Sequence, residues 1–116
     1  MLTIPMGAIT PSRVVQFLNM FTADDLLEDD FYEEVRQDLE TECLKYGLIE
    51  KIEIPRPERL SGVCSNSIGK AFVKFQYLIP AKKARQRIAG RTYNKRTVIT
   101  SFYPEERFDF KDYLKE

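Results

Sequence analysis

The stretch NSIGKAFVKF, at residues 66–75, contains the pattern that decides the fold of this chain. Successive side chains of a β-strand point to opposite faces of the sheet, so alternate residues belong together. One face receives Ala71, Val73 and Phe75, and the other receives Ile68, Lys70 and Phe72. The first set is apolar throughout and suits a face that helices cover. We therefore predict a strand over residues 70–76 with this first set against the core.

Two helices are predicted on either side of this strand. Between residues 30 and 46, apolar side chains recur at helical spacing, namely Tyr32, Val35, Leu39, Cys43 and Tyr46. Gly47 follows, and we expect it to end this helix from the C′ position, where a left-handed backbone favours glycine. A second helix is predicted over residues 80–90, with Pro80 in its first turn and Gly90 closing it.

Three further β-rich runs and an apolar tail complete the pattern. Strands are predicted at 13–20, 48–54 and 96–102, and a third helix at 104–116, where Phe108, Phe110, Tyr113 and Leu114 are available to pack. The element order is β-α-β-β-α-β, that of the ferredoxin-like fold in the α+β class. This order predicts a four-stranded antiparallel sheet with two helices on one face. Residues 1–12 are expected to be a flexible lead-in, and residues 13–103 the domain itself.

The composition argues against an enzyme. The chain has 116 residues, enough for one domain, and contains no histidine, the commonest general base and metal ligand. No Gly-rich phosphate loop is present, and we expect neither a cofactor nor a metal site. Cys43 and Cys64 lack metal-ligand spacing and are expected to be reduced thiols. No apolar run approaches the ~20 residues of a membrane span, so no membrane contact is expected.

The stretch at 66–75 also resembles the octamer of the RNA recognition motif (RRM), which reads basic, Gly, aromatic, Gly or Ala, Phe, Val, any residue, aromatic. Here Ile68 stands at the basic position and Lys70 at the first aromatic position. The hexamer VQFLNM at 15–20 places Gln16 where an aromatic ring would stack on a base. Phe72 is then the remaining stacking residue, and we expect the apolar tail to cover it. The zero net charge and the pI of about 6.4 also disfavour binding to a phosphate backbone.

Opposite charges gather in two regions of the chain. Residues 24–42 hold 10 acidic side chains and the single basic residue Arg36, whereas residues 82–96 hold 7 basic side chains and no acid. Two solvated helix faces would explain this pattern. Glu34, Asp38 and Glu42, however, form a ladder along the edge of the apolar stripe of the first helix. Carboxylates in that position suit a ligand with both cationic and aromatic parts.

The loop GRTYNKR, at residues 90–96, contains a second candidate feature. Gly90 permits a tight exit from the helix, and the side chains of Arg91 and Tyr93 can converge on one site. Alternatively, Tyr93 is the start of the fourth strand and Arg91 is a surface charge.

Three stretches carry a resemblance to a known family: LNMFTADDLLEDDFYEEV at 18–35, ECLKYGLIEKIEIPRP at 42–57 and GKAFVKF at 69–75. Together with the acidic helix and the Gly-Arg-x-aromatic loop, they resemble the U2 auxiliary factor homology motif (UHM), a protein-binding relative of the RRM. Within this family, the likeness is greatest to the C-terminal domains of U2 auxiliary factor large subunits, which act in pre-mRNA splicing.

The resemblance implies that the domain captures a UHM ligand motif, a linear peptide with one tryptophan after a run of Lys and Arg. The implied peptide-binding residues are Glu34, Asp38, Glu42, Arg91, Thr92 and Tyr93. Tyr93 stands where phenylalanine is usual and would meet the indole, and Asp38 is also placed to hold Arg91. The acids would meet the basic run of the peptide.

The implied partners are the branch-point-binding splicing factor and the largest subunit of the SF3b complex, during 3′ splice-site recognition in the nucleus. RNA would be contacted mainly through upstream domains of the full-length protein. Two alternatives remain at this stage. One is direct RNA binding by the sheet through Gln16, Lys70 and Phe72, and the other is self-association through the tail at 104–116.

Overall fold

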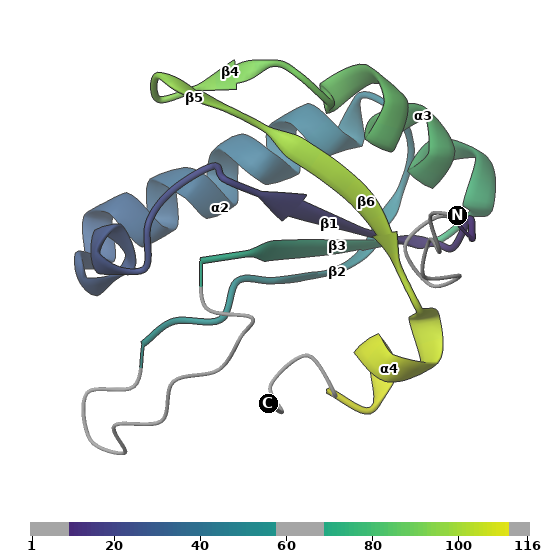
Figure 1. Cartoon of the computed structure of the whole chain (residues 1–116). Helices are drawn as coiled ribbons and strands as arrows, with labels where there is room; N and C mark the ends of the chain where they lie inside the picture. The colour runs from purple at the N-terminus through teal and green to yellow at the C-terminus, as the bar shows by residue number, and fades with distance from the viewer. Residues whose placement is uncertain (1–9, 58–68, 112–116) are drawn as a thin grey trace, which may run out of the picture.

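The computed structural model describes residues 10–57 and 69–111, which build helices around an antiparallel sheet (Figure 1). The strands of this sheet are β1 (Val14–Leu18), β2 (Ile49–Glu53), β3 (Ala71–Phe75) and β6 (Ile99–Tyr103). They lie in the order β2-β3-β1-β6, and every neighbouring pair is antiparallel. β1 and β3 are therefore central, whereas β2 and β6 form the two edges.

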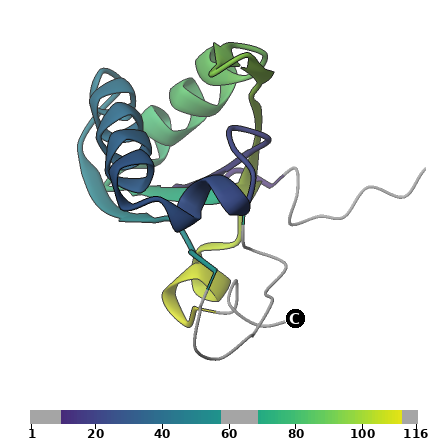
Figure 2. The ribbon, with the colours of Figure 1, turned by 90° about the vertical axis from the view of Figure 1, so that its left-hand side faces the viewer.

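The two long helices cover one face of this sheet. Figure 2 shows α2 (Asp29–Leu44) and α3 (Leu78–Ile88) on the same side, with α4 (Glu105–Asp109) on the opposite side. The predicted β-α-β-β-α-β fold and the third helix are thus confirmed. A 3-10 helix, η1 (Asp24–Leu27), precedes α2 and was not predicted. None of the helices in the described ranges is long and apolar enough to cross a bilayer.

The main core lies between the sheet and the two long helices. Each element contributes one apolar side, as predicted for β3 and α2: Val15 and Phe17 from β1, Ala71, Val73 and Phe75 from β3, Val35, Leu39 and Cys43 from α2, and Ala81, Ala84 and Ile88 from α3. All of these side chains are buried. Cys43 is a free thiol, and its burial raises the pKa of the thiol to about 12. Cys64 lies outside the described residues.

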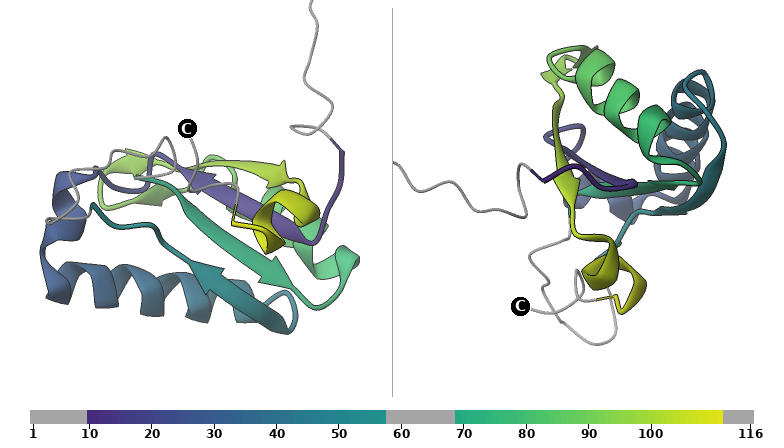
Figure 3. Two further views of the ribbon diagram at one scale, coloured as in Figure 1. Left: turned by 90° about the horizontal axis from the view of Figure 1, so that it is seen from below. Right: turned by 90° about the vertical axis from the view of Figure 1, so that its right-hand side faces the viewer.

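Part of the opposite face of the sheet is covered by α4, which Figure 3 shows over one end of the strands. Phe72 of β3 is fully buried in a small cluster with Val14 and Phe108. Its ring meets the edge of Tyr103 at 5.0 Å between centroids and lies 6.1 Å from the ring of Phe108. The expectation that the tail covers Phe72 is confirmed. Of the four apolar residues that were expected to pack, Phe108 is buried, whereas Phe110 is 77% exposed. Tyr113 and Leu114 lie outside the described residues.

A network of charges holds α4 against the sheet. Lys74 of β3 is only 6% exposed, and its Nζ lies 2.7 Å from Asp109, 2.9 Å from Glu50 and 3.6 Å from Glu105. Arg13 donates from Nε to Glu105 at 3.0 Å. A buried charge is costly unless it is paired, so these carboxylates allow Lys74 to lie under the helix.

Gly47 plays a different role from the predicted one. Helix α2 ends at Leu44, and Lys45 is the C-cap, so the glycine lies beyond the C′ position. Its φ is not among the positive values, whereas Gly90, after α3, has the predicted left-handed φ of 84°. A Cβ at Gly47 would lie 2.5 Å from both Cβ and Cγ of Pro80. The glycine is therefore required for close contact between the end of α2 and the first turn of α3.

We predict that Gly47→Ala lowers the free energy of unfolding by about 1–3 kcal/mol, because the added methyl group overlaps with Pro80. Pro80→Ala removes the Cγ half of this overlap. In a double-mutant cycle measured by denaturant unfolding, the two substitutions together should therefore cost less than the sum of the separate effects. Strict additivity would contradict the contact.

We also predict that Glu105 makes stability depend on pH in the acid range. The hydrogen bond from Arg13 lowers the pKa of this carboxyl below its ordinary value of 4.5. Its stabilising effect is therefore complete above pH 4.5 and is lost as the pH falls through the lowered pKa. Glu105→Gln should lower the free energy of unfolding by about 1 kcal/mol at neutral pH. The difference from the native chain should shrink as the pH falls. Glu106→Gln, at an exposed neighbour, is the control and should leave the pH profile of the native chain unchanged.

Candidate functional site

A cavity of about 340 Å³ opens between α2, the end of α3 and the segment that follows α3. Its lining consists of Met20, Asp38, Leu39, Thr41, Glu42, Ile88, Arg91, Thr92, Tyr93 and Val98. Five of the six residues that the sequence analysis assigned to peptide binding are in this set. The volume falls within the ~300–1,000 Å³ typical of ligand pockets.

A β-hairpin forms one wall of this cavity. Its strands are β4 (Thr92–Tyr93) and β5 (Arg96–Thr97), and the two turn residues between them, Asn94 and Lys95, have φ of 50° and 67°. Positive φ at both positions is characteristic of a type I′ turn, which matches the twist of a hairpin. The sequence analysis predicted a loop followed by one strand over 96–102. The structure divides that strand into β5 and β6, so this prediction was wrong at its start.

The hairpin is anchored at its base and at its far strand. The N–H of Gly90 donates to the carbonyl of Val98 at 2.9 Å, and the N–H of Val98 donates to the carbonyl of Arg91 at 2.8 Å. Arg96 donates from Nη2 to the Oδ1 of Asn19 at 2.8 Å, which ties β5 to the residue after β1. These bonds fix the position of the hairpin relative to the end of α3 and to β1.

The floor of the cavity is apolar. Met20, Leu39, Ile88 and Val98 are all buried and contribute their side chains to it. Sequence patterns alone do not reveal this floor, because helical spacing places Leu39 and Ile88 on the core sides of their helices, and Met20 and Val98 carry no separate signal. A side chain can pack in the core on one side and line a cavity on the other. Periodicity shows only that the side chain faces inward, so it does not distinguish these two cases.

Tyr93 spans the cavity wall and is hydrogen-bonded to α2. Its hydroxyl donates to Oδ2 of Asp38 at 2.8 Å, and its ring packs against the core cluster. Burial raises the pKa of this phenol well above its ordinary value of 10.0, and the hydrogen bond to Asp38 raises it further. The hydroxyl that distinguishes tyrosine from the usual phenylalanine therefore has a partner, which avoids the cost of burying an unpaired polar group.

Arg91 is held by Glu42, and not by Asp38 as the resemblance implied. Its Nη1 is paired with Oε1 of Glu42, and its Nη2 donates to the hydroxyl of Tyr46 at 3.2 Å. The pKa of Glu42 is lowered, first by the hydrogen bond from Lys45 at 2.9 Å and then by Arg91. Asp38 instead accepts from the phenol of Tyr93, and Glu42, one turn further along α2, pairs with the arginine.

Glu34 lies apart from the cavity lining. Its side chain is exposed, and its negative charge contributes to the raised pKa of Tyr93, so it is near the rim. Thr92 lines the cavity and is exposed. Together, the structure brings an apolar floor, one tyrosine ring and an acidic helix edge to the same place.

The three residues of the alternative RNA site lie elsewhere, and the side chains of Gln16 and Phe72 are engaged within the chain. Gln16 donates from Nε2 to the hydroxyl oxygen of Ser101 at 2.7 Å and is opposite Phe72 in the β1–β3 register. Phe72 is buried under α4, and Lys70 is half-buried just before β3. Phe72, on the face where an RRM stacks bases, is therefore covered by the chain's own helix.

A four-stranded antiparallel sheet in the order β2-β3-β1-β6, with two helices on one face, defines an RRM-type domain. Solved structures of the RNA15 RRM and of the Sex-lethal RNA recognition domains 1 and 2 from Drosophila melanogaster share this fold. Their TM-scores are 0.57 and 0.56, their sequence identities 18% and 20%, and they cover 85% and 84% of this chain and 98% and 53% of their own. Residues 11–114 match the family model described as the MUD2 C-terminal RRM domain, and the chain belongs to this family.

Relatives in other organisms support the same placement. The chain is 36% identical over 107 residues to a splicing factor U2af large subunit from Nicotiana plumbaginifolia, with 92% of this chain and 19% of the relative covered. It is 33% identical over 98 residues to the splicing factor U2AF 59 kDa subunit of Schizosaccharomyces pombe, with 83% and 18% covered. The chain thus spans about a fifth of the length of these curated relatives. The expected likeness to U2 auxiliary factor large subunits is confirmed, and RRM domains are binding modules without catalytic activity.

We predict that the hydroxyl of Tyr93 and the carboxylate of Asp38 stabilise the hairpin as a pair. In a denaturant double-mutant cycle, Tyr93→Phe and Asp38→Ala should show a coupling energy of about 1 kcal/mol, the usual worth of one hydrogen bond. Tyr77→Phe is the matched control, since that side chain is 62% exposed, and it should leave stability unchanged. Zero coupling would mean that the bond does not hold β4 to α2 in solution.

Proposed function

We propose that this domain is the protein-binding module of a pre-mRNA splicing factor and acts in the nucleus during 3′ splice-site recognition. Its ligand would be a linear motif that contains one tryptophan and a run of Lys and Arg, carried by partner splicing factors. The observation that supports this most directly is the 340 Å³ cavity, with its apolar floor, the ring of Tyr93 and the acids of α2 at its edge.

The chemistry of the cavity suits an indole. Met20, Leu39 and Val98 offer apolar surface, and Tyr93 offers a ring that a second aromatic can meet edge-to-face. A buried aromatic anchor is typically worth ~2 kcal/mol or more when it is truncated. The tryptophan would therefore supply most of the affinity.

The charge of α2 suits the basic run. Asp38 accepts one hydrogen bond from Tyr93, and a carboxylate has about four acceptor positions, so it can also accept from a Lys or Arg of the ligand. The side chain of Glu34 is exposed and makes no hydrogen bond or ion pair within the described ranges. An exposed ion pair is worth only ~0–1 kcal/mol, so these acids would act chiefly in steering and selecting the peptide.

The partners of this class are segments of the branch-point-binding splicing factor and of the largest subunit of the SF3b complex. The curated relatives are splicing factors about five times as long as this chain. Contact with RNA is therefore assigned to other domains of such a protein, since α4 covers Phe72 here.

The direct test is calorimetric titration of the chain with a synthetic peptide that has several Lys and Arg residues followed by one tryptophan. We expect saturable 1:1 binding. Tyr93→Ala in the domain, or Trp to Ala in the peptide, should weaken it by at least about 30-fold, as expected for loss of ~2 kcal/mol. Tyr77→Ala, which removes an exposed ring outside the cavity, should bind like the native chain. Unchanged binding after both cavity-directed substitutions would exclude the cavity as the site.

The role of charge is tested separately from the hairpin contacts. Glu34→Lys reverses an exposed charge at the rim without breaking the Arg91–Glu42 pair, and it should weaken binding more at low salt than at high salt. Glu33→Lys makes the same change one residue away on another side of α2 and serves as the control. Titration with a pyrimidine-rich oligonucleotide completes the test: amide shifts confined to β1 and β3 would support RNA binding by the sheet instead.

A further inference from the structure

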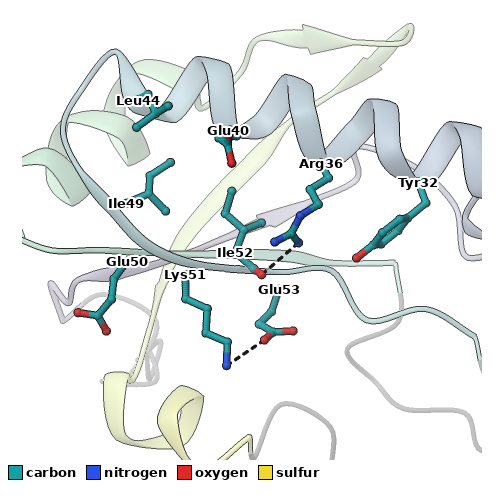
Figure 4. Close-up of a pocket in the computed structure, with 9 residues that line it drawn as sticks. All are labelled: Tyr32, Arg36, Glu40, Leu44, Ile49, Glu50, Lys51, Ile52 and Glu53. Atoms are coloured by element: carbon teal, nitrogen blue, oxygen red, sulfur yellow. Dashed lines mark hydrogen bonds and ion pairs between the residues drawn. The ribbon is translucent and has the colours of Figure 1, made fainter.

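A second hollow, of about 610 Å³, lies on another side of α2, along the free edge of the sheet (Figure 4). One wall is a stripe of α2 with one residue from each successive turn: Tyr32, Arg36, Glu40 and Leu44. The other wall is the whole of β2, from Ile49 to Glu53. None of the residues assigned above to peptide binding lines this hollow.

The edge of β2 has backbone groups directed into this hollow. Within the described residues, β2 pairs with β3 alone, so its other side is unpaired. The carbonyl of Ile52 points outward, where it accepts from Nη1 of Arg36 at 3.3 Å (Figure 4). In an antiparallel strand the N–H and C=O of one residue point to the same side, so Ile52 offers both a donor and an acceptor at the edge.

We propose that a second copy of this chain pairs with this edge, β2 against β2, around a two-fold axis at Ile52. Two Ile52 residues would exchange both backbone hydrogen bonds, as in a hydrogen-bonded antiparallel pair. With Ile52 at the axis, Lys51 of one chain faces Glu53 of the other, and the reverse pair forms by symmetry. Within one chain these two side chains already form an ion pair at 3.1 Å, so they lie on one face of the sheet and can exchange partners.

The stripe of α2 has the same two-fold complementarity. For an antiparallel approach centred between Arg36 and Glu40, Arg36 faces Glu40 of the second copy, and Tyr32 faces Leu44 of the second copy. Figure 4 shows Ile52 beneath the interval between Arg36 and Glu40, so the centres of the helix stripe and of the strand coincide. A two-fold interface requires a surface that is complementary to itself. Here the register of β2 and the register of the α2 stripe both meet this requirement around the same axis.

Side chains of the α2 stripe would gain contacts in such a pair. The side chain of Glu40 makes no hydrogen bond or ion pair within residues 10–57 and 69–111, and Leu44 is 49% exposed. Pairing of the two Ile52 residues would release Arg36 from its carbonyl and allow it to meet Glu40 of the second copy. The edge would then be covered, which removes an unpaired strand. The cavity beside Tyr93 is lined by other residues of α2 and would stay open in each chain.

The test is sedimentation of the native chain over a concentration series at low salt. We expect the average mass to rise from that of one chain, 13.6 kDa, toward twice that value. Glu40→Arg should raise the dissociation constant at least about tenfold, because two like-charge pairs replace two opposite ones. The double variant Arg36→Glu with Glu40→Arg again places opposite charges across the axis and should therefore restore association. Glu106→Arg, which makes the same charge change on α4, is the control and should associate like the native chain.

Hydrogen exchange gives a readout at the proposed axis. The N–H of Ile52 should become more protected as concentration rises in the native chain, and not in Glu40→Arg. A chain that stays at one copy at every concentration would overturn the proposal. So would association that survives Glu40→Arg but is lost on Phe110→Asp, which would assign the contact to the exposed tail.

Discussion

Burial of β3 on both faces is the constraint on which the rest of this structure depends. All five residues from Ala71 to Phe75 are buried. Its inner side chains require the cover of α2 and α3, and its outer ones, Phe72 and Lys74, require that of α4. An apolar ring and a lysine ammonium lie next to each other on the outer face, so the covering helix must bring both Phe108 and carboxylates. This requirement explains why a short helix after β6 holds its place on the sheet.

The sides of helix α2 face three different surroundings. One side, with Val35, Leu39 and Cys43, is in the core, and a second, with Asp38 and Glu42, forms the acidic edge of the cavity. A third, with Arg36 and Glu40, borders the free edge of β2. A helix can do this because residues three and four apart share a side. The acidic composition of α2 therefore reflects several separate surfaces with different partners.

The two acids that line the cavity each have a partner within the chain. Asp38 accepts from Tyr93, and Glu42 holds Arg91, so both carboxylates also connect the hairpin to α2. A hairpin held by contacts within the chain would reduce the ordering cost of the proposed binding. The tyrosine that departs from the usual phenylalanine thus gains a structural role through its hydroxyl.

The sequence by itself determined the fold and brought most of the candidate site to notice. Alternation in β3 and helical spacing in α2 are local patterns, and each states which side of an element is buried. Tertiary structure decided which acid meets which partner, because Asp38 and Glu42 share a side of α2 and the position of the hairpin sets which of them meets Tyr93 and which meets Arg91. It also decided the role of Gly47, which is set by Pro80, 33 residues further along the chain. The cavity floor was hidden for the same reason: periodicity reports that a side chain faces inward, and only the packed elements show whether the space beyond it is filled.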